Sequence, residues 1–276
     1  MPAFAAWKLL VPVAGVALIG LLMAQSGDFP TGKVRPQSAS RSGTLGYLTP
    51  QELPDSVALL RPPPQPGSAA MKSDDEARAA ALPLNGSPRY ALAAADANRE
   101  QGSTARAFQC ALGTEISPQH TPVLYELLAK IRLDVRATTY AAKSRFKRPR
   151  PFAVHGTHTC YPPDEQNVRD DGSYPSARAA VGWAYAQLLA ELNPARARQI
   201  EERGREFGES RIVCDEEWLS DVDAARTVAG ATMKHIEEKP AFRADFSAAR
   251  SELATSLRSG IKAPNCQSET RALASR

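Results

Sequence analysis

The stretch TPVLYELLAKIRLDVRATTYAAKSRF, residues 121–146, decides the fold class. Leu124, Leu128, Ile131 and Val135 recur at the spacing of one face of a helix with about 3.6 residues per turn. Pro122 suits the first position of a helix, because the N–H group that proline lacks would have no partner there. The stretch therefore predicts a long helix with one buried face.

The helical pattern continues on both sides of this stretch. It begins near residue 72, and further helices are predicted at 176–192, 195–208, near 219–238 and near 240–258. In the last of these, Phe242, Phe246, Leu253 and Leu257 share a face. The sequence shows no persuasive alternating strand pattern and no internal repeat. The expected architecture is all-α, a single helical-bundle domain.

The two ends of the chain predict its domain boundaries. Residues 9–24 form a run of sixteen uncharged residues, which is typical of a signal peptide. Residues 1–26 are therefore interpreted as a signal peptide that is removed or as an N-terminal anchor that is retained, and both place the rest of the chain outside the cytoplasm. Residues 27–70, rich in Pro, Gly and Ser, are expected to be extended. The helical domain is predicted at 71–262 and a C-terminal tail at 263–276.

Charge and cysteine content argue against two classes of function. The chain has 34 basic and 30 acidic residues, a net charge of +4, with no run of five like charges, so a nucleic-acid partner is not expected. Cys110, Cys160, Cys214 and Cys266 lack metal-ligand spacing, so no metal site is expected. In an exported chain they predict two disulfides, with three pairings open.

Three short stretches carry the residues suited to chemistry. AKSRFKRPRPF, residues 142–152, places five cations close together, and they repel one another unless an anion lies among them. GSYPSARAA, residues 172–180, begins a helix whose free N–H groups suit an anion. GESRIVCDEEWLSDVDAAR, residues 208–226, places an arginine before a dense acidic group. The acidic residues are Asp215, Glu216, Glu217, Asp221 and Asp223.

Taken in order, these stretches resemble the signature of the type 2 phosphatidic acid phosphatase and vanadium haloperoxidase superfamily, K-x6-R-P, P-S-G-H and S-R-x5-H-x3-D. Within it, the chain resembles the bacterial class A non-specific acid phosphatases over roughly residues 47–235. YLTPQELPDS, FQCALG, LYELLAK and WLSDVDAAR also read like that family. The resemblance implies a helical acid-phosphatase-type domain, a periplasmic location and hydrolysis of phosphate monoesters without a cofactor.

The resemblance also implies roles for single residues. Four residues match its phosphate-binding positions, namely Lys143, Arg150, Ser176 and Arg211, and a fifth such position, a glycine in the motif, is Ala177. Asp221 matches the aspartate that orients a nucleophilic histidine. The family reaction passes through a phosphohistidine, and a second histidine protonates the leaving alcohol. The implied ligand is a phosphate monoester or inorganic phosphate.

Both histidine positions depart from the family. P-S-G-H reads Pro175-Ser176-Ala177-Arg178, so arginine stands at the general-acid position. S-R-x5-H ends at Glu217, so glutamate stands at the nucleophile position. Arginine cannot act as an acid at usable pH. The two replacements predict either a compensating Arg178–Glu217 ion pair or independent changes at a site released from selection.

Two functions follow from these departures. The first is a family protein whose phosphate-ester pocket persists while hydrolysis is weak or lost; the alternative is a silent protein that binds phosphate, another oxyanion or a partner. Rescue by His155 or His158, or attack by Glu217 itself, would preserve turnover. Vanadate-dependent peroxidation is disfavoured because it needs a histidine at position 217. Oligomerisation is left open, and membrane contact is expected only through an uncleaved N-terminal segment.

Overall fold

The computed structural model describes residues 45–275, and the predicted signal or anchor segment lies outside them. The helices are α1 (Ser56–Leu59), α2 (Ala69–Ala81), α3 (Pro88–Ala97), α4 (Ser103–Arg106), α5 (Gln109–Leu112), α6 (Pro122–Phe146), α7 (Pro151–His155), α8 (Pro162–Arg169), α9 (Ala177–Leu192), α10 (Ala197–Val213), α11 (Leu219–Glu237), α12 (Pro240–Ser259) and α13 (Cys266–Ala274), with 3-10 turns at Leu82–Leu84 and Pro194–Arg196. The described part of the chain contains no strand, so the all-α prediction is confirmed. No helix within it is long and apolar enough to cross a membrane.

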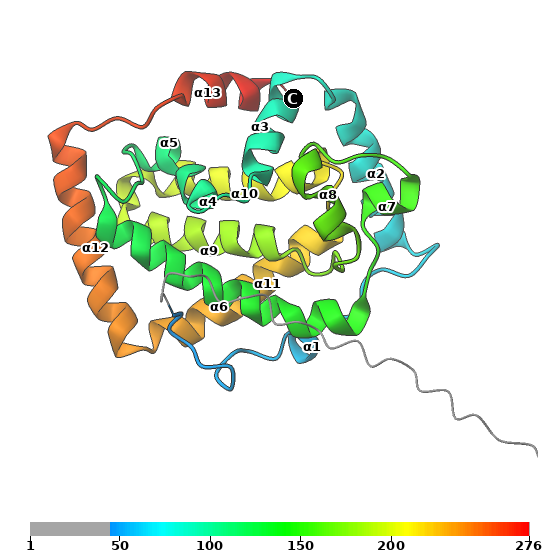
Figure 1. The fold of residues 1–276 in the computed structure, drawn as a ribbon, viewed down its shortest axis with the longest axis horizontal. Helices are drawn as coiled ribbons and strands as arrows, with labels where there is room; N and C mark the ends of the chain where they lie inside the picture. Colours follow the sequence, from blue (N-terminus) through cyan, green and yellow to red (C-terminus); the bar gives the residue numbers. More distant parts are fainter. Residues whose placement is uncertain (1–44, 276) are drawn as a thin grey trace, which may run out of the picture. The chain divides into compact units, whose positions relative to one another are not determined.

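Helix α9 is the central helix of this bundle, and α6, α10 and α11 pack around it (Figure 1). It is buried along most of its length because apolar residues occur on all of its faces. Gly204 lets α10 approach closely, since a Cβ there would lie 2.5 Å from the Cβ of Ala186 on α9. Small residues therefore allow α9 and α10 to pack closely against each other.

The long helix predicted from residues 121–146 is α6. Its four stripe residues, Leu124, Leu128, Ile131 and Val135, are all fully buried, as expected. On α12 the prediction holds for Phe242 and Leu253, whereas Leu257 is 38% exposed. Leu257 lies in the last turn of α12, where the helix extends beyond the core that its earlier turns cover.

Two disulfides connect segments that are distant in the sequence. Cys110 pairs with Cys266, and Cys160 pairs with Cys214. The first ties α5 to the start of α13, so the stretch predicted as a tail after residue 262 contains a helix fixed to the bundle. The second fixes the loop after α7 to the end of α10.

Candidate active site

The predicted site residues meet where five helices begin or end. Lys143 lies in the last turn of α6, and Arg150 is the residue immediately before α7. Ser176 caps the start of α9, and Arg211 lies in the last turn of α10. The N–H of Ser176 donates to the carbonyl of Asp221, at 3.0 Å, which joins α9 to α11. The three sequence stretches therefore form one cluster.

The start of α9 uses its capping serine for the helix itself. The Oγ of Ser176 accepts from the N–H of Ala179 at 3.1 Å. Ala177 is the first helical residue, and its Cβ is accommodated in a regular helix start. Ser176 thus stabilises one of the free N–H groups that an anion could otherwise use.

Lys143 and Arg150 are buried and already bound by acceptors of the chain. Lys143 Nζ donates to the carbonyl of Gly172 and lies 3.8 Å from the carboxylate of Asp171. Arg150 donates to Glu217 Oε1 at 2.8 Å and to the carbonyls of Val168 and Glu216 at 2.8 and 3.0 Å. Burial lowers the pKa of Lys143, whereas for Arg150 the neighbouring carboxylates outweigh burial and raise the pKa.

Glu217, at the nucleophile position, is buried against Arg150. Burial, reinforced by the nearby Asp221 and Glu216 and opposed by Arg150 and Lys143, raises its pKa to about 7. Its second oxygen, Oε2, is buried without a hydrogen-bond partner. Glu217 therefore changes charge near neutral pH.

Glu216 is a second buried carboxylate within the same group of cations. Its Oε2 lies 3.1 Å from Arg211 Nη1 and 3.9 Å from Arg99 Nη2. Arg211, Arg99, Arg150 and Arg178 together overcome the effect of burial and lower its pKa. Glu216 thus keeps its negative charge at neutral pH and supplies a carboxylate oxygen to Arg211, which the resemblance assigns to phosphate.

A tight turn explains why the two adjacent glutamates reach different cations. Asp215 adopts a left-handed conformation, φ 57°, and the N–H groups of Glu216 and Glu217 both donate back to the carbonyl of Arg211. Asp215 is held there by Arg78, at 2.7 Å, and by the hydroxyl of Thr157, at 2.5 Å. The backbone is therefore fixed with one glutamate toward Arg211 and the other toward Arg150.

The prediction of an ion pair between Arg178 and Glu217 is wrong. Arg178 donates through Nε and Nη2 to the carbonyl of Asp96, at 3.0 and 2.8 Å, and through Nη2 to the carbonyl of Asn98. These free carbonyls at the end of α3 attract the guanidinium, while Arg150 satisfies Glu217. Burial and then the nearby Arg211 and Arg99 lower the pKa of Arg178 to about 9, so it stays charged at neutral pH.

The resemblance implies that Asp221 orients the nucleophile, but in the structure its carboxylate binds Arg148 and the backbone of Trp218. Its Oδ1 accepts from Arg148 Nη1 at 2.7 Å, and its Oδ2 accepts from the N–H of Trp218 at 2.8 Å. Burial raises its pKa, and Arg148 opposes that shift. Asp221 therefore caps α11 and holds Arg148.

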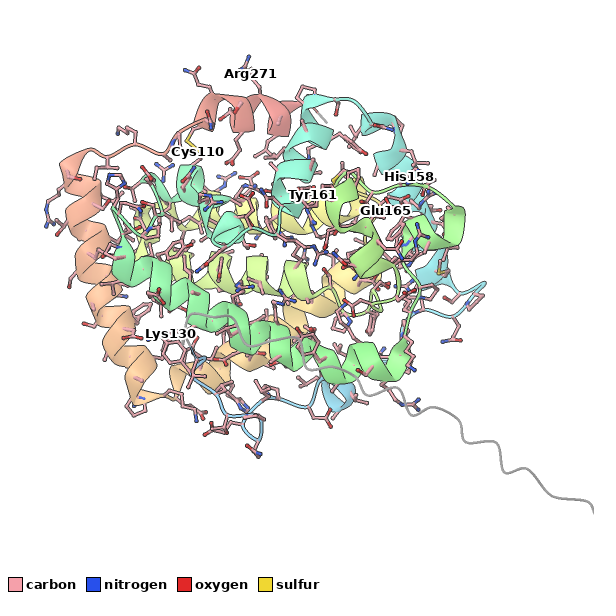
Figure 2. All side chains as sticks on the ribbon, viewed as in Figure 1. Cys110, Lys130, His158, Tyr161, Glu165 and Arg271 are labelled. Atoms are coloured by element: carbon pink, nitrogen blue, oxygen red, sulfur yellow. A yellow bond between two sulfur atoms is a disulfide. The ribbon has the colours of Figure 1, made fainter. Side chains whose placement is uncertain are left out.

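The four histidines of the chain have partners of their own. His158 is exposed and lies beside Glu165 near α8 (Figure 2). His155 packs against the ring of Trp218, with 5.9 Å between ring centroids. His120 contacts Ser117 and Glu115, and His235 contacts the carbonyl of Glu52. The geometry gives no support to a rescue by His155 or His158.

Known proteins of similar sequence are acid phosphatases. The chain is 38% identical to a non-specific acid phosphatase of Providencia stuartii over 76% of its own length and 85% of the relative. It is 37% identical to the non-specific acid phosphatase of Salmonella typhimurium, covering 75% of this chain and 83% of the relative. An acid phosphatase of Zymomonas mobilis is 35% identical over 85% of this chain and 89% of the relative. The chain belongs to the acid phosphatase family. No protein-family model matches the sequence.

Several residues of this acid-phosphatase-family site were not found from the sequence. Glu216 was noted only as part of an acidic group, and Arg99 was not considered. Arg148 was one of five clustered cations, yet it bridges Asp221 and Asp74, with Nη2 at 2.6 Å from Asp74 Oδ2. The available signal was the group of cations in 143–150 and the group of acids in 215–221. Because buried charges in one domain are paired, these two groups could have been expected to pair with each other.

Proposed function

We propose that this chain is an exported, periplasmic member of the acid phosphatase family whose phosphate-ester pocket persists but whose phosphomonoester hydrolysis is weak or lost. One observation carries the proposal: the groups at the two chemical positions are Glu217, bound to Arg150, and Arg178, bound to backbone carbonyls. Neither is available to attack phosphorus or to protonate an alcohol.

The chain's own carboxylates support this reading. Arg211 and Arg150 donate to Glu216 and Glu217, so a phosphate ester in the pocket has to displace these carboxylates before it is held for hydrolysis. A glutamate at position 217 could form an acyl phosphate in principle. Its hydrogen bond to Arg150 holds the carboxylate, and the pKa of about 7 that burial causes leaves the group mostly protonated, and so unable to attack, at acidic pH.

A second function, reversible binding of an oxyanion, is favoured by a separate observation. Arg211 Nε is a buried donor without a hydrogen-bond partner, and Glu217 Oε2 gains a proton when the carboxyl is neutral. Together they offer two donors below about pH 7. We infer that anions enter this pocket preferentially at acidic pH.

The location rests on the N-terminal hydrophobic run and on the cysteines. Both disulfide pairs are formed within the described residues, as suits an oxidising compartment. Residues 1–26 as a removed signal peptide or as a retained anchor both fit an exported protein.

Turnover of p-nitrophenyl phosphate between about pH 4.5 and 7.5 tests the proposal, with the Salmonella typhimurium relative assayed in parallel. We expect kcat/KM for this chain to be lower by at least about 1,000-fold, because both reacting groups are replaced. A value within about tenfold of the relative would refute the proposal.

A further inference from the structure

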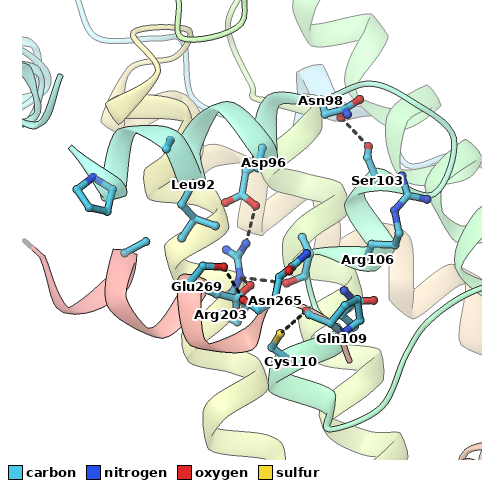
Figure 3. A pocket seen from close by; sticks show the side chains of 17 residues that line it. Leu92, Asp96, Asn98, Ser103, Arg106, Gln109, Cys110, Arg203, Asn265 and Glu269 are labelled. Atoms are coloured by element: carbon cyan, nitrogen blue, oxygen red, sulfur yellow. Dashed lines mark hydrogen bonds and ion pairs between the residues drawn. The ribbon is translucent and has the colours of Figure 1, made fainter. Parts of the chain in front are cut away.

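A cavity of about 500 Å3 lies outside the cluster of motif residues, between α3, α4–α5, α10 and α13 (Figure 3). The Cys110–Cys266 disulfide holds α13 over it. The backbone carbonyl of Asp96, which binds Arg178, belongs to a residue whose side chain faces this cavity. The volume is in the range of sites for small organic ligands.

Two residues that line this cavity each carry a polar atom that is buried without a hydrogen-bond partner. One is the donor Nη1 of Arg203, a side chain that is 2% exposed, and the other is the acceptor Oε1 of Gln109. Leaving such atoms unpaired destabilises the folded protein. A ligand that pairs both of them removes this destabilisation.

The remaining donors of Arg203 are engaged, which fixes its guanidinium. Nη2 donates to Asp96 Oδ1 at 2.5 Å, and Nε donates to the carbonyl of Ala107 at 3.1 Å (Figure 3). Glu269 of α13 lies 3.5 Å from the same Nε. Because three partners hold the side chain, Nη1 is a preorganised donor rather than a mobile one.

The charge of the lining limits the ligand. Arg203 and the half-exposed Arg106 are balanced by Asp96 and Glu269, so the lining has no surplus positive charge to hold a dianion, whereas a monoanion matches one free guanidinium nitrogen. Leu92 and the small side chains of Ala91 and Ala95 form an apolar wall. A ligand body with a ring or short hydrocarbon fits against it.

We propose that this cavity is a second ligand site that takes a small organic carboxylate bearing a hydroxyl or amine. Its carboxylate accepts from Arg203 Nη1, its hydroxyl or amine donates to Gln109 Oε1, and its apolar body lies on α3. This site is separate from the phosphate pocket and does not depend on its chemistry.

Calorimetric titration of the full-length chain at about pH 7 tests the proposal with 3-hydroxybenzoate and with benzoate, which lacks the hydroxyl. We expect one-to-one binding of 3-hydroxybenzoate, at least about tenfold tighter than benzoate, because only the former pairs Gln109. Ala95→Trp fills the cavity from an exposed helix position and weakens 3-hydroxybenzoate at least tenfold. Gln109→Leu, nearly isosteric, removes the preference between the two probes.

Glu217→Gln is the matched control, because it alters the phosphate pocket and leaves 3-hydroxybenzoate binding unchanged. Circular dichroism checks that each variant folds. If Ala95→Trp does not fold, the comparison of the two probes in Gln109→Leu tests the proposal. The proposal is overturned if wild type binds neither probe, if benzoate binds equally well, or if a folded Ala95→Trp variant binds like wild type. Tighter binding of glycerol 3-phosphate than of 3-hydroxybenzoate, lost in Ala95→Trp, would also overturn the carboxylate assignment.

Discussion

Glu216 and Glu217 are neighbours in the chain but respond in opposite ways to the cations around them. Glu216 is stabilised as an anion by Arg211 and Arg99, and its pKa is lowered despite burial. Glu217 has one ion-pair partner, Arg150, and burial dominates, so its pKa rises to about 7. Of these two neighbouring carboxylates, Glu216 therefore stays negatively charged and Glu217 changes its charge with pH.

Sulfate binding should depend on pH through Glu217. Sulfate keeps its charge between about pH 5.5 and 8, so a change in affinity reports on the protein. Below the pKa of about 7 Glu217 is neutral, so its negative charge no longer competes with an anion for Arg150. As pH rises through that value the carboxylate forms and competes, so we expect roughly tenfold weaker binding at pH 8 than at pH 5.5.

The Glu217→Gln variant separates this effect from other titrations. Lys143, whose pKa is lowered by burial, would also weaken anion binding as it loses its proton. If Glu217 is the cause, the variant binds sulfate with nearly constant affinity, close to the acidic value of wild type. An unchanged pH profile in the variant, measured by calorimetry, would exclude Glu217 as the titrating group.

Removing the charge of Glu216 should strengthen phosphate binding at all pH values. Glu216→Gln keeps the shape of the side chain but removes the counter-ion of Arg211, while Arg99 keeps its pair with Asp164. We expect inorganic phosphate to bind at least about tenfold more tightly, because a charged hydrogen bond of this kind contributes roughly 1.5–3 kcal/mol. Glu202→Gln, on the exposed side of α10, is the control. Equal phosphate affinity in the two variants contradicts the competition.

Helices α2, α6 and α11 are joined near the site by one buried arginine. Arg148, just beyond α6, binds Asp74 of α2 and Asp221 of α11, at 2.6 and 2.7 Å. Ser220 adds hydrogen bonds to Asp74 at 2.7 Å from both its N–H and its hydroxyl. The start of α11, and with it the turn that carries Glu217, depends on this network.

Arg148→Met should therefore be strongly destabilising. It leaves two buried carboxylates without their cation, which costs roughly 3–5 kcal/mol in the free energy of unfolding. Urea denaturation measures the loss. Arg145→Met, at an exposed position on α6, should stay within about 0.5 kcal/mol of wild type. Similar losses in both variants would show that the network contributes little.

The sequence predicted the long helices well because their apolar residues repeat with the helical period. It missed α13 because that helix is short and is held by the Cys110–Cys266 pairing, which spacing alone did not select. It located Lys143, Arg150, Arg211 and Glu217 through motif spacing. It could not assign partners, because the left-handed turn at Asp215 and the free carbonyls after α3 determine which charges meet.

The described part of the molecule as a whole is an acid-phosphatase-type bundle closed by two disulfides that differ in position. Cys214 is fully buried beside the site, whereas Cys110 and Cys266 lie near the surface and hold α13. Apart from this disulfide, α13 is attached through the Arg203–Glu269 pair and the buried Ala272. The two disulfides are therefore expected to protect different parts of the bundle.

Hydrogen exchange distinguishes these contributions. In a Cys110→Ser, Cys266→Ser variant we expect the amides of α13 to exchange much faster while those of α9 remain protected, because opening is local. In a Cys160→Ser, Cys214→Ser variant we expect all helices to exchange faster, because the free energy of unfolding of the whole bundle falls by roughly 2–4 kcal/mol. Uniform deprotection in the first variant would contradict the local attachment of α13.

We propose that the phosphatase scaffold is retained while its two reacting groups are replaced. Measuring kcat/KM for p-nitrophenyl phosphate in Arg178→His, Glu217→His beside wild type and both single variants tests it most directly. We expect the double variant to exceed wild type by at least about 100-fold and each single variant to gain far less, because nucleophile and acid act together. Substantial wild-type turnover that the double substitution leaves unchanged would contradict the claim.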